Sequence, residues 1–393
     1  METFNVRLLY LYKCMSGCLP IYAFYTILFL ERGMSVTDVA LLMVIWSSFT
    51  IIFEIPSAIL ADRWIRRNML AIAAMLQGTC FIIWYFSHSF VMFAVGFVFW
   101  AAAAAFTSGT EEGLTYDNLK SDGCEEDFAG VYGKARFFAS AGTVIGIGSA
   151  GILAGFIPIG TIALISAAIC FMNAVLVLQI REKNYYSERL DEEEIGFFQT
   201  FREAAVFVKG SRIALAAILF SLFFTCLGTY LDEFDALIIN DLQLDHIWVS
   251  VILTVRFVFI ALGDILAPHL QKRISSLRTV SLLNGAACML LVVFALFWSW
   301  LAFPVFGLAL MVMAIAEILI IQVIQKEIKE EGRATVMSFY GVGQNLVMIG
   351  FCLIYAVLTG AFGLQQIYLI LSVYGMAGGL SCWLLFNRIQ QVR

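Results

Sequence analysis

Charged residues are scarce in this chain. They make up 13% of its 393 residues, about half the share found in soluble proteins. Hydrophobic residues make up 61%, and the mean hydropathy is +0.89. The few lysines and arginines form no basic patch of the kind that binds nucleic acid. This composition excludes an ordinary soluble domain and predicts a chain that lies in a lipid bilayer.

The residue patterns of metal and catalytic sites are also lacking. The nine cysteines are odd in number and show no Cys-x-x-Cys or Cys/His spacing, so we interpret them as packing residues. The three histidines, His88, His246 and His269, fall at the ends of apolar runs. No nucleophile lies beside a base, and no phosphate-binding loop occurs. We therefore expect no enzyme, no cofactor and no metal site.

Long apolar runs are what the chain has in abundance. A bilayer core about 30 Å thick is crossed by about 20 apolar residues in a helix, and twelve such runs are present. They span residues 8–30, 39–61, 69–86, 90–110, 137–156, 159–180, 213–239, 247–267, 280–298, 301–323, 336–358 and 364–386. The sequence predicts an all-α protein with twelve transmembrane helices.

The distribution of positive residues predicts the orientation of these helices. Of the 24 lysines and arginines, Arg32 sits in a loop after an odd-numbered run, and Lys13 and Arg256 lie inside runs. The others fall at the termini or after even-numbered runs. Positive residues stay in the cytoplasm, so we expect a multi-pass protein of the cell (inner or plasma) membrane with both termini cytoplasmic. The first run lacks a cleavage pattern and is expected to remain, and we expect a monomer.

The chain divides into two halves. Residues 182–212 form a polar stretch that we interpret as a cytoplasmic linker between bundles of six helices, 1–181 and 213–393. A shift of 206 residues lays "ILADRWIRR" (59–67) on "ILAPHLQKR" (265–273) and Glu111 on Glu317. Such matches at equivalent places indicate a duplicated unit, which is a known transporter architecture.

The junction after the second run resembles a known family. Its residues Ala58, Leu60, Ala61, Asp62, Arg63, Arg66, Arg67 and Leu70 look like the major facilitator superfamily signature Gly-x-Leu-Ala-Asp-Arg-x-Gly-Arg-Lys. Ala58 and Ile65 replace its two glycines. The stretches "FWAAAAAFTSGTEEGLTYDNL" and "VYGKARF" are similar to bacterial drug or metabolite exporters of that family. The resemblance implies the fold of two pseudo-symmetric six-helix bundles.

The resemblance also implies a conformational latch. In the family, the aspartate of this junction faces the N-terminus of the eleventh helix, and the arginines pair with an acid that ends the fourth. Here these roles fall to Asp62, and to Arg63 or Arg67 with Asp117. A carboxylate at a helix N-terminus gains about 0.3 to 1 kcal/mol. The alternative is that the arginines are topology signals, which is the interpretation we adopt for Arg66.

Ionisable residues inside the apolar runs are candidates for proton coupling, because a charge there costs at least about 2.5 kcal/mol and needs a partner or a water-filled cavity. The candidates are Glu54, Glu111, Asp232, Asp235 and Glu317. Glu54, beside Pro56, is the first choice, since a carboxyl group away from water is more readily held in the protonated form that a proton carrier needs. Structural hydrogen bonding, or a place at the outer interface for Asp232 and Asp235, is the alternative.

Two cations accompany these acids. Lys13 is expected to extend its ammonium group to the cytoplasmic surface. Arg256, near the middle of its run, is interpreted either as a structural partner of an acid or as a group that binds substrate. Aromatic residues make up 15% of the chain and suit amphipathic solutes. Those on runs expected to approach the cavity are Tyr22, Tyr25, Trp46, Trp100 and Tyr116.

Together these features favour a proton-coupled, multidrug-type efflux transporter. A carboxylate in an apolar cavity holds either a proton or a cationic solute, and competition between the two gives antiport of small amphipathic cationic or neutral molecules. The alternative is a proton-coupled importer of a small polar or anionic solute that Arg256 binds. The run 137–156 has glycines for close packing, among them Gly142 and Gly146, but the family's Gly-Pro motif and its arginine in the fourth helix are missing.

Overall fold

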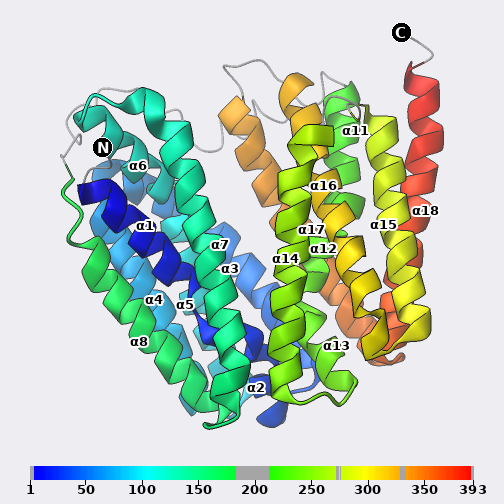
Figure 1. The fold of residues 1–393 in the computed structure, drawn as a ribbon, viewed down its shortest axis with the longest axis horizontal. Helices are drawn as coiled ribbons and strands as arrows, with labels where there is room; N and C mark the ends of the chain where they lie inside the picture. The colour runs from blue at the N-terminus through cyan, green and yellow to red at the C-terminus, as the bar shows by residue number, and fades with distance from the viewer. Residues whose placement is uncertain (1–3, 183–211, 271–273, 275, 328–332, 391–393) are drawn as a thin grey trace. The chain divides into compact units, whose positions relative to one another are not determined.

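The computed structural model describes residues 4–182, 212–270, 274, 276–327 and 333–390, which are helical and contain no strand (Figure 1). Among them are twelve helices that are long and apolar enough to cross a membrane, as the hydropathy of the sequence predicts. Several of these helices extend past their apolar runs. The fifth, for example, begins at Phe128, because polar residues outside the hydrocarbon can continue a helix whose hydrogen bonds are already formed.

Contacts divide the chain into two compact units: Met1–Glu194 with His246–Val251, and Ile195–Asp245 with Ile252–Arg393. The predicted linker lies outside the described residues except for its two ends. The helices of the first half are α1 (Phe4–Gly17), η1 (Pro20–Ala23), α2 (Tyr25–Glu31), α3 (Val36–Arg63), α4 (Arg66–Phe86), α5 (Phe90–Thr107), α6 (Thr110–Ser121), η2 (Glu125–Asp127), α7 (Phe128–Ala154) and α8 (Ile159–Val177).

The second half begins with a helix in several pieces. These are α11 (Arg212–Phe220), a π-helical turn η3 (Ser221–Thr225), α12 (Leu227–Leu231), η4 (Asp232–Phe234) and α13 (Asp235–Asp241). The remaining helices are α14 (His246–Leu270), α15 (Leu277–Phe297), η5 (Trp300–Ala302), α16 (Phe303–Glu327), α17 (Arg333–Thr359) and α18 (Leu364–Gln390).

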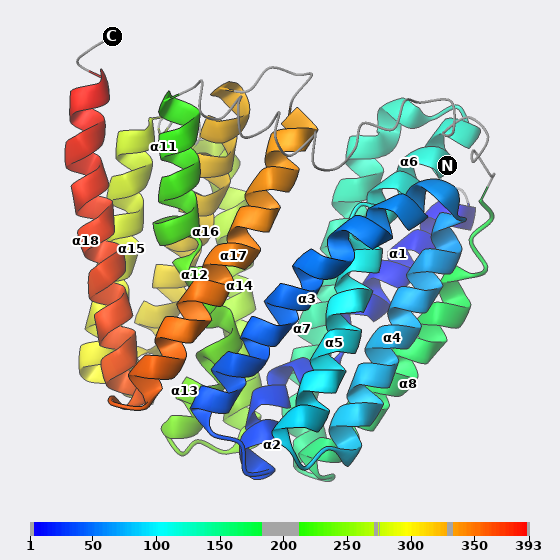
Figure 2. The same ribbon diagram turned by 180° about the vertical axis from the view of Figure 1, so that it is seen from behind.

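Within the first unit, α4 lies between α5 and α8, α3 packs on α5, and α1 packs on α7 (Figure 2). The last pair approaches closely because α7 carries glycine at the contact. A Cβ atom at Gly142 would overlap the carbonyl oxygen of Cys14, and one at Gly146 would lie 2.6 Å from the amide nitrogen of Leu19. These two glycines therefore allow the close packing that the sequence predicts. In the second unit α15 packs on α16 and α18, which matches the packing of α4 on α5 and α8 under the predicted repeat.

Two membrane crossings of the first unit are interrupted. The first crossing breaks between Gly17 and Tyr25, where a 3-10 turn joins α1 to α2. The fourth crossing breaks at Ser108 and Gly109, between α5 and α6. Gly109 adopts φ 69°, a left-handed conformation that glycine tolerates without steric cost. Interrupted helices leave backbone groups without helical partners and in transporters line binding cavities.

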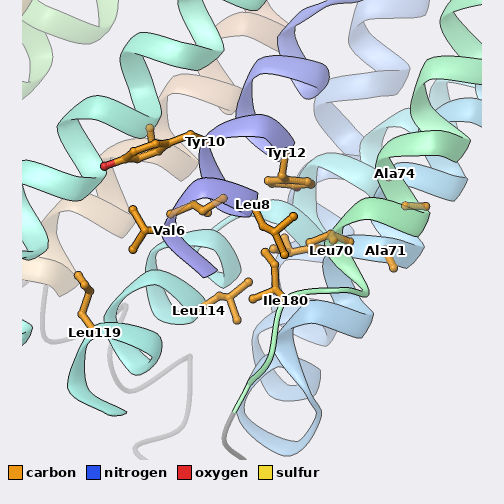
Figure 3. Packing of buried hydrophobic residues seen from close by; sticks show 14 residues of the cluster. Val6, Leu8, Tyr10, Tyr12, Leu70, Ala71, Ala74, Leu114, Leu119 and Ile180 are labelled. Carbon is orange, nitrogen blue, oxygen red and sulfur yellow. The ribbon is translucent and has the colours of Figure 1, made fainter. Parts of the chain in front are cut away.

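A hydrophobic cluster at one end of the first unit holds these pieces together. Its side chains come from α1, α4, α6, α7 and the end of α8, and include Leu8, Leu70, Leu114 and Ile180 (Figure 3). Leu70 and Leu114 are completely buried. Burial of such a side chain stabilises the fold by about 1.5 to 3 kcal/mol. The cluster therefore anchors α6 against α1 and α4, although the fourth crossing is broken.

Candidate functional site

A cavity of about 490 Å³ lies within the first unit, at the two helix interruptions. This volume is in the range of small-molecule sites. The described residues that line it are Tyr12, Lys13, Ser16, Tyr22, Ala74, Gln77, Trp100, Ala103, Ala104, Thr107, Ser108, Gly109, Glu111, Glu112, Tyr132 and Asn173. The lining combines aromatic rings, hydroxyl and amide groups, and three charged side chains.

An ion pair forms one wall of the cavity. The ammonium group of Lys13, on α1, contacts the carboxylate of Glu111, in the first turn of α6. Their side chains are 14% and 11% exposed. The expectation that Lys13 extends its ammonium group to the membrane surface is therefore wrong, because the group has an anionic partner within the unit. The N-terminus of α6 favours carboxylates in its first turn as well.

The other carboxylates near the cavity have neutral partners. The hydroxyl of Tyr132 donates a hydrogen bond to Glu112 (2.8 Å), which also lines the cavity. Glu54, on α3, accepts a hydrogen bond from the hydroxyl of Ser108 at 3.4 Å. Ser108 lies at the helix interruption, so Glu54 is connected to the cavity lining through it. The role predicted for Glu54 in proton coupling stays a prediction.

Amide side chains from two further helices complete the polar lining. Gln77, on α4, donates a hydrogen bond to the hydroxyl of Tyr22 at 2.5 Å. Asn173, on α8, is 3% exposed and donates to the carbonyl of Tyr12 at 3.2 Å. The Oδ1 atom of Asn173 has no hydrogen-bond partner among the described residues. A buried acceptor without a partner is costly, so this atom marks a place where a ligand donor or water can bind.

Two of the five predicted aromatic residues reach the cavity. The rings of Tyr22 and Trp100 stack with centroids 5.7 Å apart, and both line the cavity. Trp46 packs on Trp100 from outside the lining, at 6.1 Å. Tyr25 is buried against Trp84. Tyr116 is 45% exposed and packs on the ring of Phe128, so its side chain lies away from the cavity because of its phase on α6.

A second charged cluster lies inside the second unit. Arg256, on α14, forms ion pairs with Asp232 and with Asp235, where its Nε lies 2.6 Å from Oδ2. The hydroxyl of Tyr368, on α18, donates a hydrogen bond to Asp235 at 2.7 Å. Arg256 is 4% exposed and Asp235 is 2% exposed, whereas the side chain of Asp232 is 42% exposed. The sequence allows Arg256 to be either the structural partner of an acid or a group that binds substrate. The structure shows it as the ion-pair partner of two acidic residues.

Glu317 lies in a different part of the second unit. Thr229 is within hydrogen-bonding reach of its carboxylate, and Asp264 is a neighbouring charge. Close by, a buried network follows the π-helical turn of the seventh crossing. The hydroxyls of Ser221 and Tyr340 are 2.7 Å apart, and Tyr340 also contacts the sulfur of Cys226 at 3.2 Å. π-helical turns often occur at functional sites.

The charged junction after the second crossing holds α4 against α6. Asp117 pairs with Arg66 at 3.1 Å, so the expected pairing with Arg67 is wrong, and Arg66 is more than a topology signal. The guanidinium of Arg66 lies where a Cβ at Gly113 would stand. The side chains of Asp62 and Arg63 are outside the described ones, and the latch stays a prediction.

Arg67 contributes to a different interaction at the same junction. Its guanidinium donates to the carbonyl of Ile180 at 2.9 Å. The carboxylate of Glu182 accepts hydrogen bonds from the amides of Arg66 and Arg67, at 3.2 and 2.9 Å. Glu182 therefore caps the N-terminus of α4 from the segment that follows α8. Orphan amides at a helix start favour such a carboxylate.

Sequence reasoning missed several of these residues. Gln77 and Asn173 are amide residues in the middle of apolar runs, a signal that was available in the sequence. The interruption at Gly109 was also visible, as the "TSGTEEG" stretch. Glu182 and Tyr368 carried no such signal, because their roles depend on residues more than 100 positions away in the chain.

Comparison with known proteins identifies the family of the chain. Residues 14–351 match the sequence model of the Major Facilitator Superfamily. A segment of 108 residues is 32% identical to the uncharacterized MFS-type transporter YfkF of Bacillus subtilis (strain 168); it covers 27% of this chain and about a quarter (25%) of that relative.

Solved transporter structures share the fold at low identity. The nucleoside transporter NupG superposes with a TM-score of 0.78 at 16% identity, over 97% of this chain and 98% of that one. A bacterial homologue of the human lysosomal transporter Spinster gives 0.67 at 16% identity, over 99% and 95% of the two chains. The chain therefore belongs to the Major Facilitator Superfamily and is a multi-pass membrane transporter.

Proposed function

We propose that the chain is a secondary active transporter of the cell membrane that moves a small cationic or neutral amphipathic solute outward in exchange for protons. The charge of the cavity lining carries this proposal. Its described charged residues are two carboxylates, Glu111 and Glu112, and one ammonium, Lys13. One negative charge is left over. A proton or a solute cation can neutralise it, but not both at once, and this competition couples their movements in opposite directions.

The cluster in the second unit supports proton coupling. Arg256 faces Asp232 and Asp235 at the same time, so this trio has one net negative charge that a single proton neutralises. Asp232 is the exposed member, and we assign the entry of the proton to it. Within a membrane an uncompensated charge is costly, so a change in protonation would alter the packing of the seventh and eighth crossings. Alternating access needs such a two-state element.

An anionic solute is poorly supported by this geometry. To bind one, Arg256 would have to leave two carboxylates, and breaking a buried ion pair costs about 3 to 5 kcal/mol. The cavity of the first unit would also repel an anion, because its described charges already sum to a negative value. If the protein is an importer instead, a polar but uncharged solute fits this geometry better than an anionic one. Gln77, Tyr22 and Asn173 favour it, since they offer amide and hydroxyl groups of the kind that fix polar solutes.

Everted membrane vesicles that contain the protein test the direction and the coupling together. With an acid-inside pH gradient, the proposal expects ethidium to accumulate in the vesicles and to be released when a protonophore collapses the gradient. Glu111→Gln should abolish accumulation. The matched control Glu126→Gln, an exposed carboxylate of η2 outside the cavity lining, should transport like the wild type.

Two results would count against the proposal. Accumulation that ignores the pH gradient would remove proton antiport, and full activity of Glu111→Gln would remove the assignment of the cavity charge. Accumulation of uridine by right-side-out vesicles under an acid-outside gradient, with no ethidium transport in everted ones, would establish the importer instead.

A further inference from the structure

The ion pair of Lys13 with Glu111 differs in its surroundings from the ion pair of Arg256 with Asp235. The partners Arg256 and Asp235, in the second unit, are 4% and 2% exposed. Lys13 and Glu111, in the first unit, are 14% and 11% exposed, and both form part of the wall of the 490 Å³ cavity. Lysine carries its compact ammonium on a flexible stem of four carbons. It can therefore leave Glu111 and move aside without unfolding α1.

We propose that Lys13 occupies a cation subsite when the transporter is empty, and that among aromatic cations this cavity prefers those which carry a primary ammonium group next to the aromatic ring. The ammonium of the solute replaces that of Lys13 on Glu111. The proposal rests on the proposed function and specifies its substrate class. An ammonium group is also what the subsite already holds, so its size and its three donors fit the space around Glu111.

The hydrogen-bonding groups of the lining favour a solute that donates. The hydroxyls of Ser16 and Thr107 donate to the backbone carbonyls of Lys13 and Ala103, which leaves their oxygens as acceptors. Asn173 is almost completely buried, uses its amide nitrogen on Tyr12, and leaves Oδ1 without a partner among the described residues. Together with the carboxylates, these oxygens offer acceptors to a solute that donates hydrogen bonds. An ammonium group donates and never accepts.

The charge balance selects a single positive charge. Lys13, Glu111 and Glu112 together carry one net negative charge. A monovalent cation makes the loaded cavity neutral, whereas an anion makes it more negative. The stacked rings of Tyr22 and Trp100 lie in the same lining and provide contact area for an aromatic ring and cation–π attraction for the ammonium.

Binding of benzylamine and of its neutral counterpart, benzyl alcohol, tests the proposal. Affinities are measured by calorimetry on the purified full-length protein in detergent. Lys13→Gln removes the resident cation, so benzylamine should bind about ten-fold tighter or more, which corresponds to about 1.4 kcal/mol. Benzyl alcohol should bind as it does to the wild type. The double variant Lys13→Gln, Glu111→Gln is the matched control and should lose the gain.

Lys13→Arg keeps the ion pair and provides a second measurement if Lys13→Gln does not fold. A guanidinium binds a carboxylate with two parallel hydrogen bonds and is harder to displace. Benzylamine should then bind about ten-fold weaker, with benzyl alcohol unchanged. Lys13 in a purely structural role predicts no gain for Lys13→Gln and no selective loss for Lys13→Arg.

The proposal is overturned if folded Lys13→Gln binds benzylamine no tighter than the wild type, if benzyl alcohol gains equally, or if Lys13→Arg leaves benzylamine binding unchanged. These outcomes are separate from those of the transport assay. A gain in Lys13→Gln without gradient-driven transport leaves the substrate class standing and removes antiport. Gradient-driven transport without tighter binding of benzylamine to Lys13→Gln leaves antiport standing and removes the substrate class.

Discussion

Replacing Gly113 with alanine places a methyl group where the Arg66 guanidinium now lies. The guanidinium is the far end of a flexible side chain, so it moves away and gives up its ion pair with Asp117. The side chains of that pair are 15% and 12% exposed, and losing a charge-assisted contact costs about 1.5 to 3 kcal/mol. Alanine stabilises the helix by about 1 kcal/mol relative to glycine, because its helix propensity is higher. The net loss is about 0.5 to 2 kcal/mol.

The same substitution should have the opposite sign when Arg66 is already absent. In the Arg66→Ala background the three atoms nearest to the new methyl group are gone, so Gly113→Ala should stabilise the protein by about 1 kcal/mol. Unfolding of the wild type, the two single variants and the double variant in mixed micelles gives the four free energies of a double-mutant cycle.

Equal effects of Gly113→Ala in the two backgrounds would refute the reasoning. That result would mean that the guanidinium does not depend on the space above Gly113. A coupling of about 1.5 to 3 kcal/mol supports it. The interaction bears on function because it holds α6, which presents Glu111 to the cavity, against α4.

Three further predictions concern the helix contacts and the proton cluster. Glu182→Ala removes the cap of α4 and should lower the free energy of unfolding by about 1 kcal/mol, measured in the same micelles. Gly142→Ala places a methyl group on a backbone carbonyl of α1 and should lower the melting temperature, whereas Gly130→Ala, on the same helix with nothing within 4 Å, should raise it. Asp235→Asn should abolish solute accumulation driven by a pH gradient but leave solute exchange without a gradient measurable. The exposed control Asp245→Asn should keep both activities. Loss of both activities in Asp235→Asn would mean that Asp235 has a structural role.

Local pattern decided which residues are candidates, and the fold decided their partners. Glu111 and Arg256 stand out because a charge in an apolar run needs compensation, and no knowledge of the fold is required to see it. The partner of Glu111, however, is Lys13, 98 residues away in the chain. Nothing in the neighbourhood of either residue shows that the two helices bring them to one cavity.

Helix phase explains the correction at the charged junction. Arg66 and Arg67 are neighbours, but adjacent residues of an α-helix point about 100° apart. The orientation of α4 relative to α6 directs Arg66 to Asp117 and Arg67 to the end of α8. A sequence motif places both arginines at the junction and carries no information on this rotation.

The sequence by itself determined the class of protein and its twelve crossings, and it predicts a division into two related halves. These follow from hydropathy and spacing, since every membrane crossing must satisfy its own backbone within about 20 apolar residues. Only the tertiary structure decided that the first and fourth crossings break at one cavity, that Lys13 forms an ion pair with Glu111, and that Arg256 forms ion pairs with two aspartates. Those arrangements depend on packing between distant helices, because each buried charge is stable only where another helix supplies its partner.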